Sequence, residues 1–273
     1  MAIQQMMLGV GAGLDFGDIT SSGLVLYLDA GNSNSYSGSG YAWYDLTNKN
    51  NDATLRNEYG VDHSPSYSST SGGGSFSFNG SDEHARIPDS TDFIFPVGSP
   101  STSVGEFTQE AWFKRSSSSG EEIVLERGDS TTSNASWCGL RMTMNYDGDK
   151  IIARQLHHSE PTGQYEYSAG QYSTVFEIPS GWVHMVVTKY SHNAIKLFLN
   201  GDPKVWSVRW GGQGWQSRGT SVSSDYDINI AGGDSSTRFT GEIAILRVYK
   251  NKALSDSEVL AHYNAEKTRF GHS

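Results

Sequence analysis

Apolar and polar residues alternate with a period of two along much of the chain, most clearly between Trp182 and Trp210. Successive side chains of a β-strand point to opposite faces, so each alternating segment has one apolar face to bury. Asn200-Gly201 then suits the positive φ angles of a tight hairpin turn, and Pro203 follows where a missing hydrogen-bond donor costs least. The pattern predicts a meander of three antiparallel strands. Its alternating apolar positions are Val183, Met185 and Val187, then Ile195, Leu197 and Leu199.

Similar alternation predicts further strands before and after the meander. We expect Phe107, Gln109, Ala111 and Phe113 to share one face, with Trp112 packing in a second apolar layer. The segment 243–249 is apolar on both faces, which is typical of a central strand. In it, Ile243, Ile245, Arg247 and Tyr249 are expected on one face and Ala244, Leu246 and Val248 on the other. Shorter strands are predicted around 24–28, 43–46, 53–55, 76–78, 84–87, 138–144, 151–152 and 226–230.

The chain is predicted to close with a helix. Ser255 and Glu258 form the S-x-x-E capping-box pattern, and Val259, Leu260 and Tyr263 supply an apolar stripe. The predicted strands outnumber this single helix by far. Because one meander cannot cover its own apolar face, a second sheet must pack against it.

The strands and turns also resemble a known family. The run WVHMVVTKYSHNAIKLFLNGDPKV is similar to the central signature of laminin-G-like, concanavalin-A-like jelly-roll domains, and other segments follow in that family's order from about Gly23 to Phe270. The resemblance implies an all-β, two-sheet antiparallel jelly-roll sandwich over residues 23–273. Residues 1–22 then form a short amino-terminal arm, and the helix lies at the carboxyl end. The same sandwich carries lectins, hydrolases and assembly modules, so the fold alone does not specify a function.

Composition excludes several classes of protein. The net charge is −10 and the pI is about 5.2, which argues against nucleic acid as a partner because that surface needs a basic face. The single cysteine, Cys138, permits no disulfide within the chain. The chain has no run of 18 or more apolar residues, so we expect no membrane segment.

The amino-terminal arm is interpreted as a docking segment that buries its apolar residues against another chain. Its opening, with Gln4-Gln5 before a Met-Leu-Gly run, is similar to the start of virion structural proteins of tailed bacteriophages, cyanophages in particular. The carboxyl end, EVLAHYNAEKTRFG, resembles the close of sandwich domains in such proteins. The resemblance implies a virion location, other virion proteins as partners, and a homo-oligomer. The docking residues are Ile3, Met6, Met7, Leu8 and Val10.

Retaining glycoside hydrolases of this architecture carry a catalytic carboxylate pair on one strand. Glu122 and Glu126 are expected to share a face about 13 Å apart, at about 3.3 Å per residue. Val124 stands where those enzymes have an aspartate, and a valine cannot tune the ionisation of its neighbours. The run His157-His158 has no partner at a recognisable ligand spacing. The sequence therefore predicts a protein without catalytic function, and a glycan hydrolase is the weakest of the functional hypotheses.

Two binding hypotheses remain open. Calcium is a candidate ligand because acidic turns around Asn79, Asp147 and Asp227 offer oxygen ligands, although the same residues are usual in β-turns, and no ligands are assigned. Exposed aromatic rings stack on the apolar faces of sugars or on a neighbouring subunit. The aromatic candidates are Trp206, Trp210, Trp215, Tyr165, Tyr167 and Tyr172.

The favoured interpretation is a structural protein of a tailed-phage virion, in a capsid decoration or a tail or fibre appendage, that binds polysaccharide on the host surface. The alternative is a stand-alone lectin-like module. Of the aromatic candidates, Trp215 is expected to make the outward contact, because the glycines around it offer little core.

Overall fold

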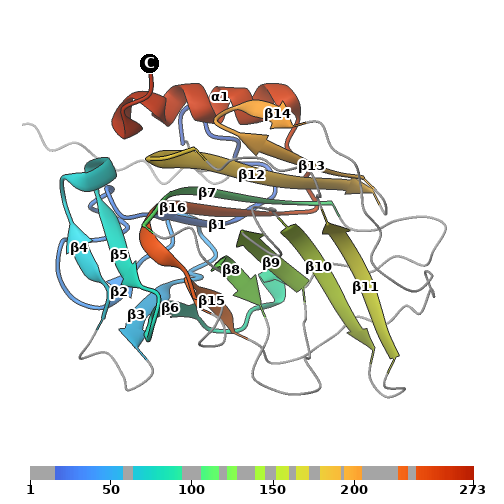
Figure 1. The fold of residues 1–273 in the computed structure, drawn as a ribbon, viewed down its shortest axis with the longest axis horizontal. Coiled ribbons are helices and arrows are strands. Elements are labelled where there is room, and N and C mark those ends of the chain that lie inside the picture. Colours follow the sequence, from blue (N-terminus) through green and yellow to red (C-terminus); the bar gives the residue numbers. More distant parts are fainter. Residues whose placement is uncertain are drawn as a thin grey trace, which may run out of the picture.

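The computed structural model describes residues 16–57, 64–93, 106–116, 122–127, 139–144, 152–159, 164–171, 179–191, 194–204, 227–232 and 238–273. Over this part of the chain, two antiparallel sheets pack face to face, and one helix lies on the outer side of one of them (Figure 1). This is the predicted jelly-roll sandwich, so the fold prediction is confirmed. None of the described helices is long and apolar enough to cross a membrane.

The first sheet, sheet A, is built around the predicted meander. The structure confirms the meander as β12 (Trp182–Ser191), β13 (Ala194–Leu199) and β14 (Asp202–Lys204). Across the sheet the order is β14-β13-β12-β7-β16-β5-β4, and β1 also pairs with β16. The remaining strands are β7 (Phe107–Arg115), β16 (Thr240–Lys250), β5 (Ser75–Asn79), β4 (Ser66–Ser68) and β1 (Leu24–Asp29).

The second sheet, sheet B, has the order β11-β10-β9-β8-β15-β6-β3-β2. Every strand pair described in it is antiparallel. Its strands are β11 (Gln164–Gln171), β10 (Ile152–Ser159), β9 (Gly139–Met144), β8 (Glu122–Arg127), β15 (Ile228–Ile230), β6 (Glu83–Ile87), β3 (Ala53–Asn57) and β2 (Ala42–Trp43).

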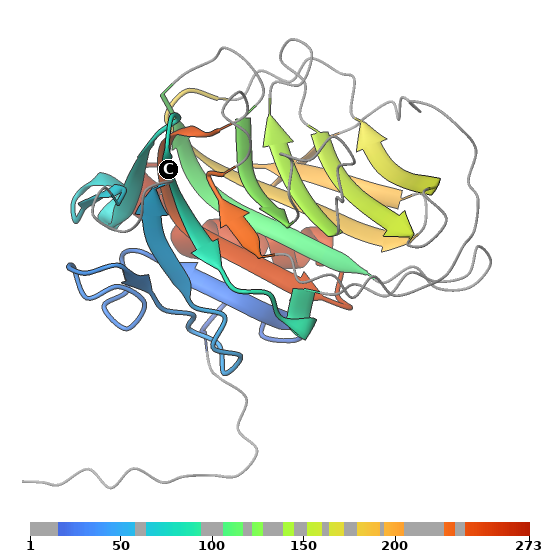
Figure 2. The same ribbon diagram turned by 90° about the horizontal axis from the view of Figure 1, so that it is seen from below.

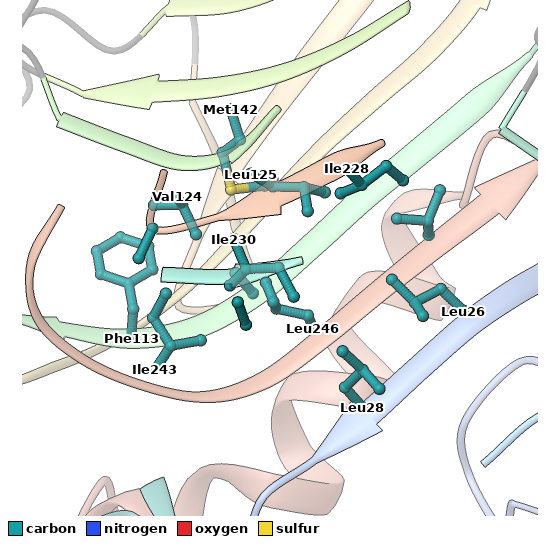
Figure 3. Packing of buried hydrophobic residues seen from close by; sticks show 14 of the residues in the cluster. Leu26, Leu28, Phe113, Val124, Leu125, Met142, Ile228, Ile230, Ile243 and Leu246 are labelled. Atoms are coloured by element: carbon teal, nitrogen blue, oxygen red, sulfur yellow. The ribbon is translucent and has the colours of Figure 1, made fainter. Parts of the chain in front are cut away.

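The core fills the space between the two sheets (Figure 3). Leu26 and Leu28 of β1, with Phe113 of β7, face Ile228 and Ile230 of β15. Full burial of one such side chain stabilises the fold by about 1.5–3 kcal/mol. A second apolar layer on the far side of sheet A contains Trp112, Val186 and Phe198, which confirms the position predicted for Trp112.

The second layer is closed by the carboxyl-terminal helix α1 (Asp256–Glu266) and a 3₁₀ turn, η3 (Lys267–Phe270). The Ser255 side chain accepts from the Glu258 amide and the Glu258 side chain accepts from the Ser255 amide, so the predicted capping box is confirmed. The predicted apolar stripe is wrong at one position. Leu260 is 46% exposed, whereas His262 is buried in the face that packs on sheet A. Two further 3₁₀ turns are η1 (Ser71–Gly73) and η2 (Thr91–Phe93).

A bulge in β16 corrects the predicted faces of that strand. Its pairing with β7 shifts register between Ile243 and Ile245, so the alternation changes phase there. Ile243 lies in the core between the sheets, and Ile245 lies in the second layer beside Tyr249. Leu246 returns to the core. As predicted, β16 is buried on both faces in the middle of sheet A, between β7 on one side and β1 and β5 on the other.

Candidate functional site

The outer faces of the two sheets differ. Helix α1 lies on the outer face of sheet A, whereas no described helix or strand covers the outer face of sheet B, which is turned toward the viewer in Figure 2. On β15, Ile228 and Ile230 are buried in the core, so Asn229 between them points outward. The outer face of sheet B is therefore the candidate site.

A row of polar residues crosses this face over four adjacent strands. The strand register places Thr54 of β3 opposite Arg86 of β6, Arg86 opposite Asn229, and Asn229 opposite Glu126 of β8. Directly opposite residues share a face, with Cβ atoms about 4.5–5.5 Å apart. Thr54 and Arg86 are exposed, Asn229 is half-buried and Glu126 is buried. Thr54, Arg86, Asn229 and Glu126 are called the polar row below.

Basic side chains adjoin one end of the polar row. Arg56 of β3 stands directly opposite His84 of β6, and Arg86 follows His84 by two residues on the same face. Burial lowers the pKa of His84, and the positive charges of Arg56, Arg238 and Arg86 lower it further. A hydrogen bond with the Asp82 carbonyl raises this pKa but does not offset the other effects. His84 is therefore neutral at pH 7. Arg56, His84, Arg86 and Arg238 are called the basic cluster.

A chain of ion pairs orients the arginines around β15. The Asp227 carboxylate forms an ion pair with Nε of Arg86 and accepts a hydrogen bond of 2.8 Å from the Asp89 amide. Asp89 in turn accepts from Nη2 of the buried Arg127 at 2.7 Å. The Arg86 guanidinium is thus held in position although its side chain remains 48% exposed.

Two exposed aromatic residues flank the edge strand of the same sheet. Tyr41 is 43% exposed and Tyr44 is 49% exposed, on either side of β2, whereas Trp43 between them is fully buried. Ala42 of β2 stands opposite Thr54, at the end of the polar row. Sheet B therefore combines hydrogen-bonding groups with aromatic rings at its edge.

The outer face of sheet A is instead closed by a buried charged network. Glu110 of β7 accepts hydrogen bonds from Arg247 Nη1 at 2.8 Å, from His184 Nε2 at 2.8 Å and from His262 Nδ1 at 3.1 Å. Burial by itself raises the pKa of Glu110, but Arg247 and His262 hold it well below its usual value. Arg247 also pairs with Glu266 of α1, so the network fastens the helix to the sheet.

This network contains a group with metal-ligating atoms but is not suited to a metal. One ligand atom each of Glu110, His184 and Glu266 lies within 4.8 Å of the others. The Arg247 guanidinium already bonds both carboxylates, so a metal ion would meet a fixed positive charge. In addition, the Trp112 ring stacks on Phe270 at 4.0 Å between centroids and donates from Nε1 to Glu266 at 2.7 Å. We interpret Glu110, His184 and Glu266 as part of a buried ion-pair network that holds α1 on sheet A.

The structure corrects the expected placement of Glu122 and Glu126. The pairing of β8 with β9 shifts between Ile123 and Leu125, so a bulge at Val124 reverses the alternation. Glu122 faces the other sheet, where it accepts from Arg115 Nε at 2.6 Å and from the Thr240 amide at 3.3 Å. Glu126 belongs to the outer face. The two carboxylates therefore do not share a face and do not form a catalytic pair.

Most of the aromatic candidates and the docking arm lie outside the described residues. This applies to Trp206, Trp210, Trp215 and Tyr172, and to Ile3, Met6, Met7, Leu8 and Val10. Tyr165 and Tyr167 lie on β11, the edge strand at the end of sheet B opposite β2. These assignments stay predictions.

The acidic turns proposed for calcium are partly described. At the Asn79 turn, the Asn79 side chain accepts from the amides of Ser81 and Asp82 and donates to Asp82 Oδ1 at 2.7 Å. The Asp227 carboxylate is engaged by Arg86, while Asp147 lies outside the described residues. Calcium binding remains a prediction.

The sequence analysis missed the polar row, the basic cluster and the exposed tyrosines. Asn229 alternates with Ile228 and Ile230, and Arg86 alternates with Ala85 and Ile87, which was the available signal for an outward face. That β3, β6, β15 and β8 are neighbours depends on strand order, which the local pattern does not contain.

The fold and this face together define a lectin-like β-sandwich in which α1 closes the outer face of sheet A and no helix among the described residues lies on the outer face of sheet B. The chain belongs to the concanavalin A-like lectin/glucanases superfamily, whose laminin-G-type family model matches residues 78–260. No curated protein sequence matches the chain.

Solved structures with a similar fold include binding domains and parts of enzymes. Domain 4 of AbnA, a GH43 extracellular arabinanase from Geobacillus stearothermophilus, in complex with arabinotriose, is 17% identical with a TM-score of 0.56, and the match covers 87% of this chain and 96% of that domain. Trypanosoma rangeli sialidase in complex with sialic acid is 17% identical with a TM-score of 0.53, and the match covers 98% of this chain and 36% of the sialidase chain. The binding domain of Paraclostridial Mosquitocidal Protein 1 is 14% identical with a TM-score of 0.56, and the match covers 92% of this chain and 55% of that chain. The chain thus spans about a third of the sialidase chain.

These comparisons correct one expectation. The prediction of a protein without catalytic function is wrong, because chains of this fold occur in an arabinanase and in a sialidase. The fold is compatible with glycosidase activity. The separation of Glu122 from Glu126 excludes only that pair.

Proposed function

We propose that the protein binds carbohydrate on the outer face of sheet B as a component of a tailed-phage virion. The observation that carries the proposal is the polar row, which runs across four adjacent strands and in which Thr54 and Arg86 are exposed and Asn229 is half-buried. At a strand spacing of about 4.7–4.9 Å the accessible part of the row, from Thr54 to Asn229, is roughly 10 Å long, so it presents an extended surface rather than a single contact.

The chemistry of the row suits a sugar. Sugar hydroxyls both donate and accept hydrogen bonds. The accessible part of the row offers donors from Arg86 and both donors and acceptors from Thr54 and Asn229, whereas Glu126 is buried at its inner end. The rings of Tyr41 and Tyr44 at the edge are exposed and suited to stack on the apolar C–H faces of a sugar. A domain of the same fold has been solved with arabinotriose, which supports a carbohydrate as the ligand.

Glycan-array binding and calorimetric titration with the best array ligand test this proposal. We expect Asn229→Ala to weaken binding at least tenfold, because Asn229 is at the centre of the row. Lys196→Ala is the matched control. Lys196 is exposed on β13 in sheet A and pairs with Asp256, so its loss should leave binding unchanged. Unchanged affinity of a correctly folded Asn229→Ala protein would refute the assignment of the face.

The virion context rests on the resemblance at the two ends of the chain. Phe16 packs edge-on against Tyr27 at 5.3 Å, and the Thr20 amide donates to Nε2 of His262 in α1 at 2.9 Å. The chain therefore enters on the α1 side. An arm that docks there on other virion proteins, in a homo-oligomer, would leave sheet B turned away from the particle.

Deletion of residues 2–15 tests the docking arm while keeping Phe16 on Tyr27. We expect the truncated protein to fold with an unchanged melting temperature and to bind glycan as before, but to be missing from purified particles. Normal incorporation into particles would contradict the docking arm. Glycan binding without any association of the full chain with particles would indicate the stand-alone lectin-like module.

A further inference from the structure

The basic cluster at one end of the polar row is unexpected in a chain with a net charge of −10. Four residues contribute to it from β3, β6 and the segment that precedes β16. We infer that the carbohydrate is an acidic polysaccharide, and that Arg56 and Arg86 bind a carboxylate on one of its sugars. This inference rests on the proposed function and specifies the ligand class for the same face.

The strand register determines the geometry of the cluster. Arg56 pairs with His84, and Arg86 pairs with Thr54, so Arg56 and Arg86 are diagonal neighbours on one face. Diagonal neighbours lie about 7–8 Å apart at the backbone, a distance that long side chains bridge. The two guanidinium groups can therefore converge on one anionic group over the face of the sheet.

Arg86 is positioned in advance for such a contact. Asp227 holds its guanidinium through Nε, and Asp227 is itself fixed by the Asp89 amide at 2.8 Å. Since the side chain stays 48% exposed, the group remains accessible from solvent. A guanidinium presents several N–H donors in a planar fork that matches the two oxygens of a carboxylate, and a fixed fork loses less entropy on binding.

His84 adds a neutral group to the cluster. Its Nδ1 lies 3.2 Å from the Asp82 carbonyl oxygen, which only accepts, so Nδ1 carries the hydrogen. Nε2 is then an acceptor for a sugar hydroxyl. Because the surrounding arginines and burial lower its pKa, His84 does not add a charge at neutral pH. The cluster thus offers arginine for the acid group and histidine for a hydroxyl on the same sugar.

Two pairs of polymers distinguish this inference from the proposed function. Polygalacturonate is compared with its methyl ester, which has the same backbone without the charge, and dextran sulfate is compared with dextran. We expect polygalacturonate to bind at least tenfold more tightly than the ester and more tightly than dextran sulfate. The variants Arg56→Gln and Arg86→Gln should each weaken polygalacturonate binding about tenfold. Arg56→Gln, which lies outside the polar row, should leave array binding to neutral glycans much less affected, whereas Arg86→Gln should weaken both.

Lys196→Gln is the charge-matched control, because it removes one positive charge from the sheet A side of the molecule. An equal loss of affinity in Lys196→Gln would mean that the polymer responds to overall charge, and the inference would fail. Equal binding of polygalacturonate and its ester, or preference for dextran sulfate, would also overturn it and leave the proposed function intact. Absence of binding to every glycan on the array would overturn both. Because Arg86 pairs with Asp227, melting temperatures of all variants show whether folding is retained.

Discussion

The charged network under α1 makes a quantitative prediction for the substitution Glu110→Gln. The side chain keeps its size, but the carboxylate that accepts from Arg247, His184 and His262 loses its charge. Arg247 is fully buried and cannot turn to water. The substitution therefore tests how much a buried ion pair contributes when its positive partner must remain in the protein.

Breaking a buried ion pair by removing one partner costs about 3–5 kcal/mol, because the remaining charge is left desolvated. Arg247 keeps Glu266 as a second partner, so we take the lower end, about 3 kcal/mol. For a domain of this size, each kcal/mol lowers the melting temperature by about 2–4 °C, which gives a fall of about 6–12 °C.

Urea unfolding and a thermal melt of the two proteins, at pH 7 and the same ionic strength, measure this difference. Lys196→Ala is again the control. Its ion pair with Asp256 also joins sheet A to α1, but both side chains are largely exposed, so the loss should stay below about 1 kcal/mol. A Glu110→Gln protein within 1 kcal/mol of the unchanged protein would show that the network contributes little and that apolar packing alone holds α1.

Three further predictions test other parts of the structure. Burial lowers the pKa of Lys189 to about 7, so between pH 7 and 10.5 the unfolded chain binds a proton that the folded chain does not. The free energy of unfolding should therefore rise with pH in this range, by up to about 5 kcal/mol. Urea unfolding should show that Lys189→Met abolishes this rise and is more stable than the unchanged protein at pH 7. In thermal melts, Ser255→Ala should cost about 1 kcal/mol by removing the helix cap, and an unchanged melting temperature would contradict this. Gly201 and Gly271 both have φ near +80°, so an alanine is strained at either position. Only at Gly201 would the added Cβ also meet the Tyr263 ring, at 2.9 Å. Denaturant unfolding should therefore show Gly201→Ala to be clearly less stable than Gly271→Ala.

The sequence predicted the elements better than their faces. The alternation around Asn200-Gly201 located the meander, and Ser255 with Glu258 located the start of α1, because both signals lie within a few residues. Predictions failed where a bulge inserts one residue, as at Val124 and beside Ile245. One extra residue reverses every later side chain, and a valine or alanine at the bulge gives no distinctive local signal.

The candidate site was the least predictable part of the molecule. Exposed aromatic residues were sought in glycine-rich segments, whereas the described exposed rings, Tyr41 and Tyr44, flank the buried Trp43 on an edge strand. Arg56 and Arg86 look like ordinary surface charges in their own strands. Only the pairing of β3 with β6 shows that they are neighbours.

The sequence by itself determined that this protein is an antiparallel sandwich with a capped terminal helix, because the period of its apolar residues and the chemistry of its turns act over short distances along the chain. Only the tertiary structure decided that β15 lies between β6 and β8, and that α1, the one α-helix in the described part of the chain, closes sheet A rather than sheet B. The physical reason is that strand order follows from packing between core residues far apart in the chain, such as Leu55, Ile87 and Ile230, and this order is what makes Thr54, Arg86 and Asn229 neighbours on the outer face.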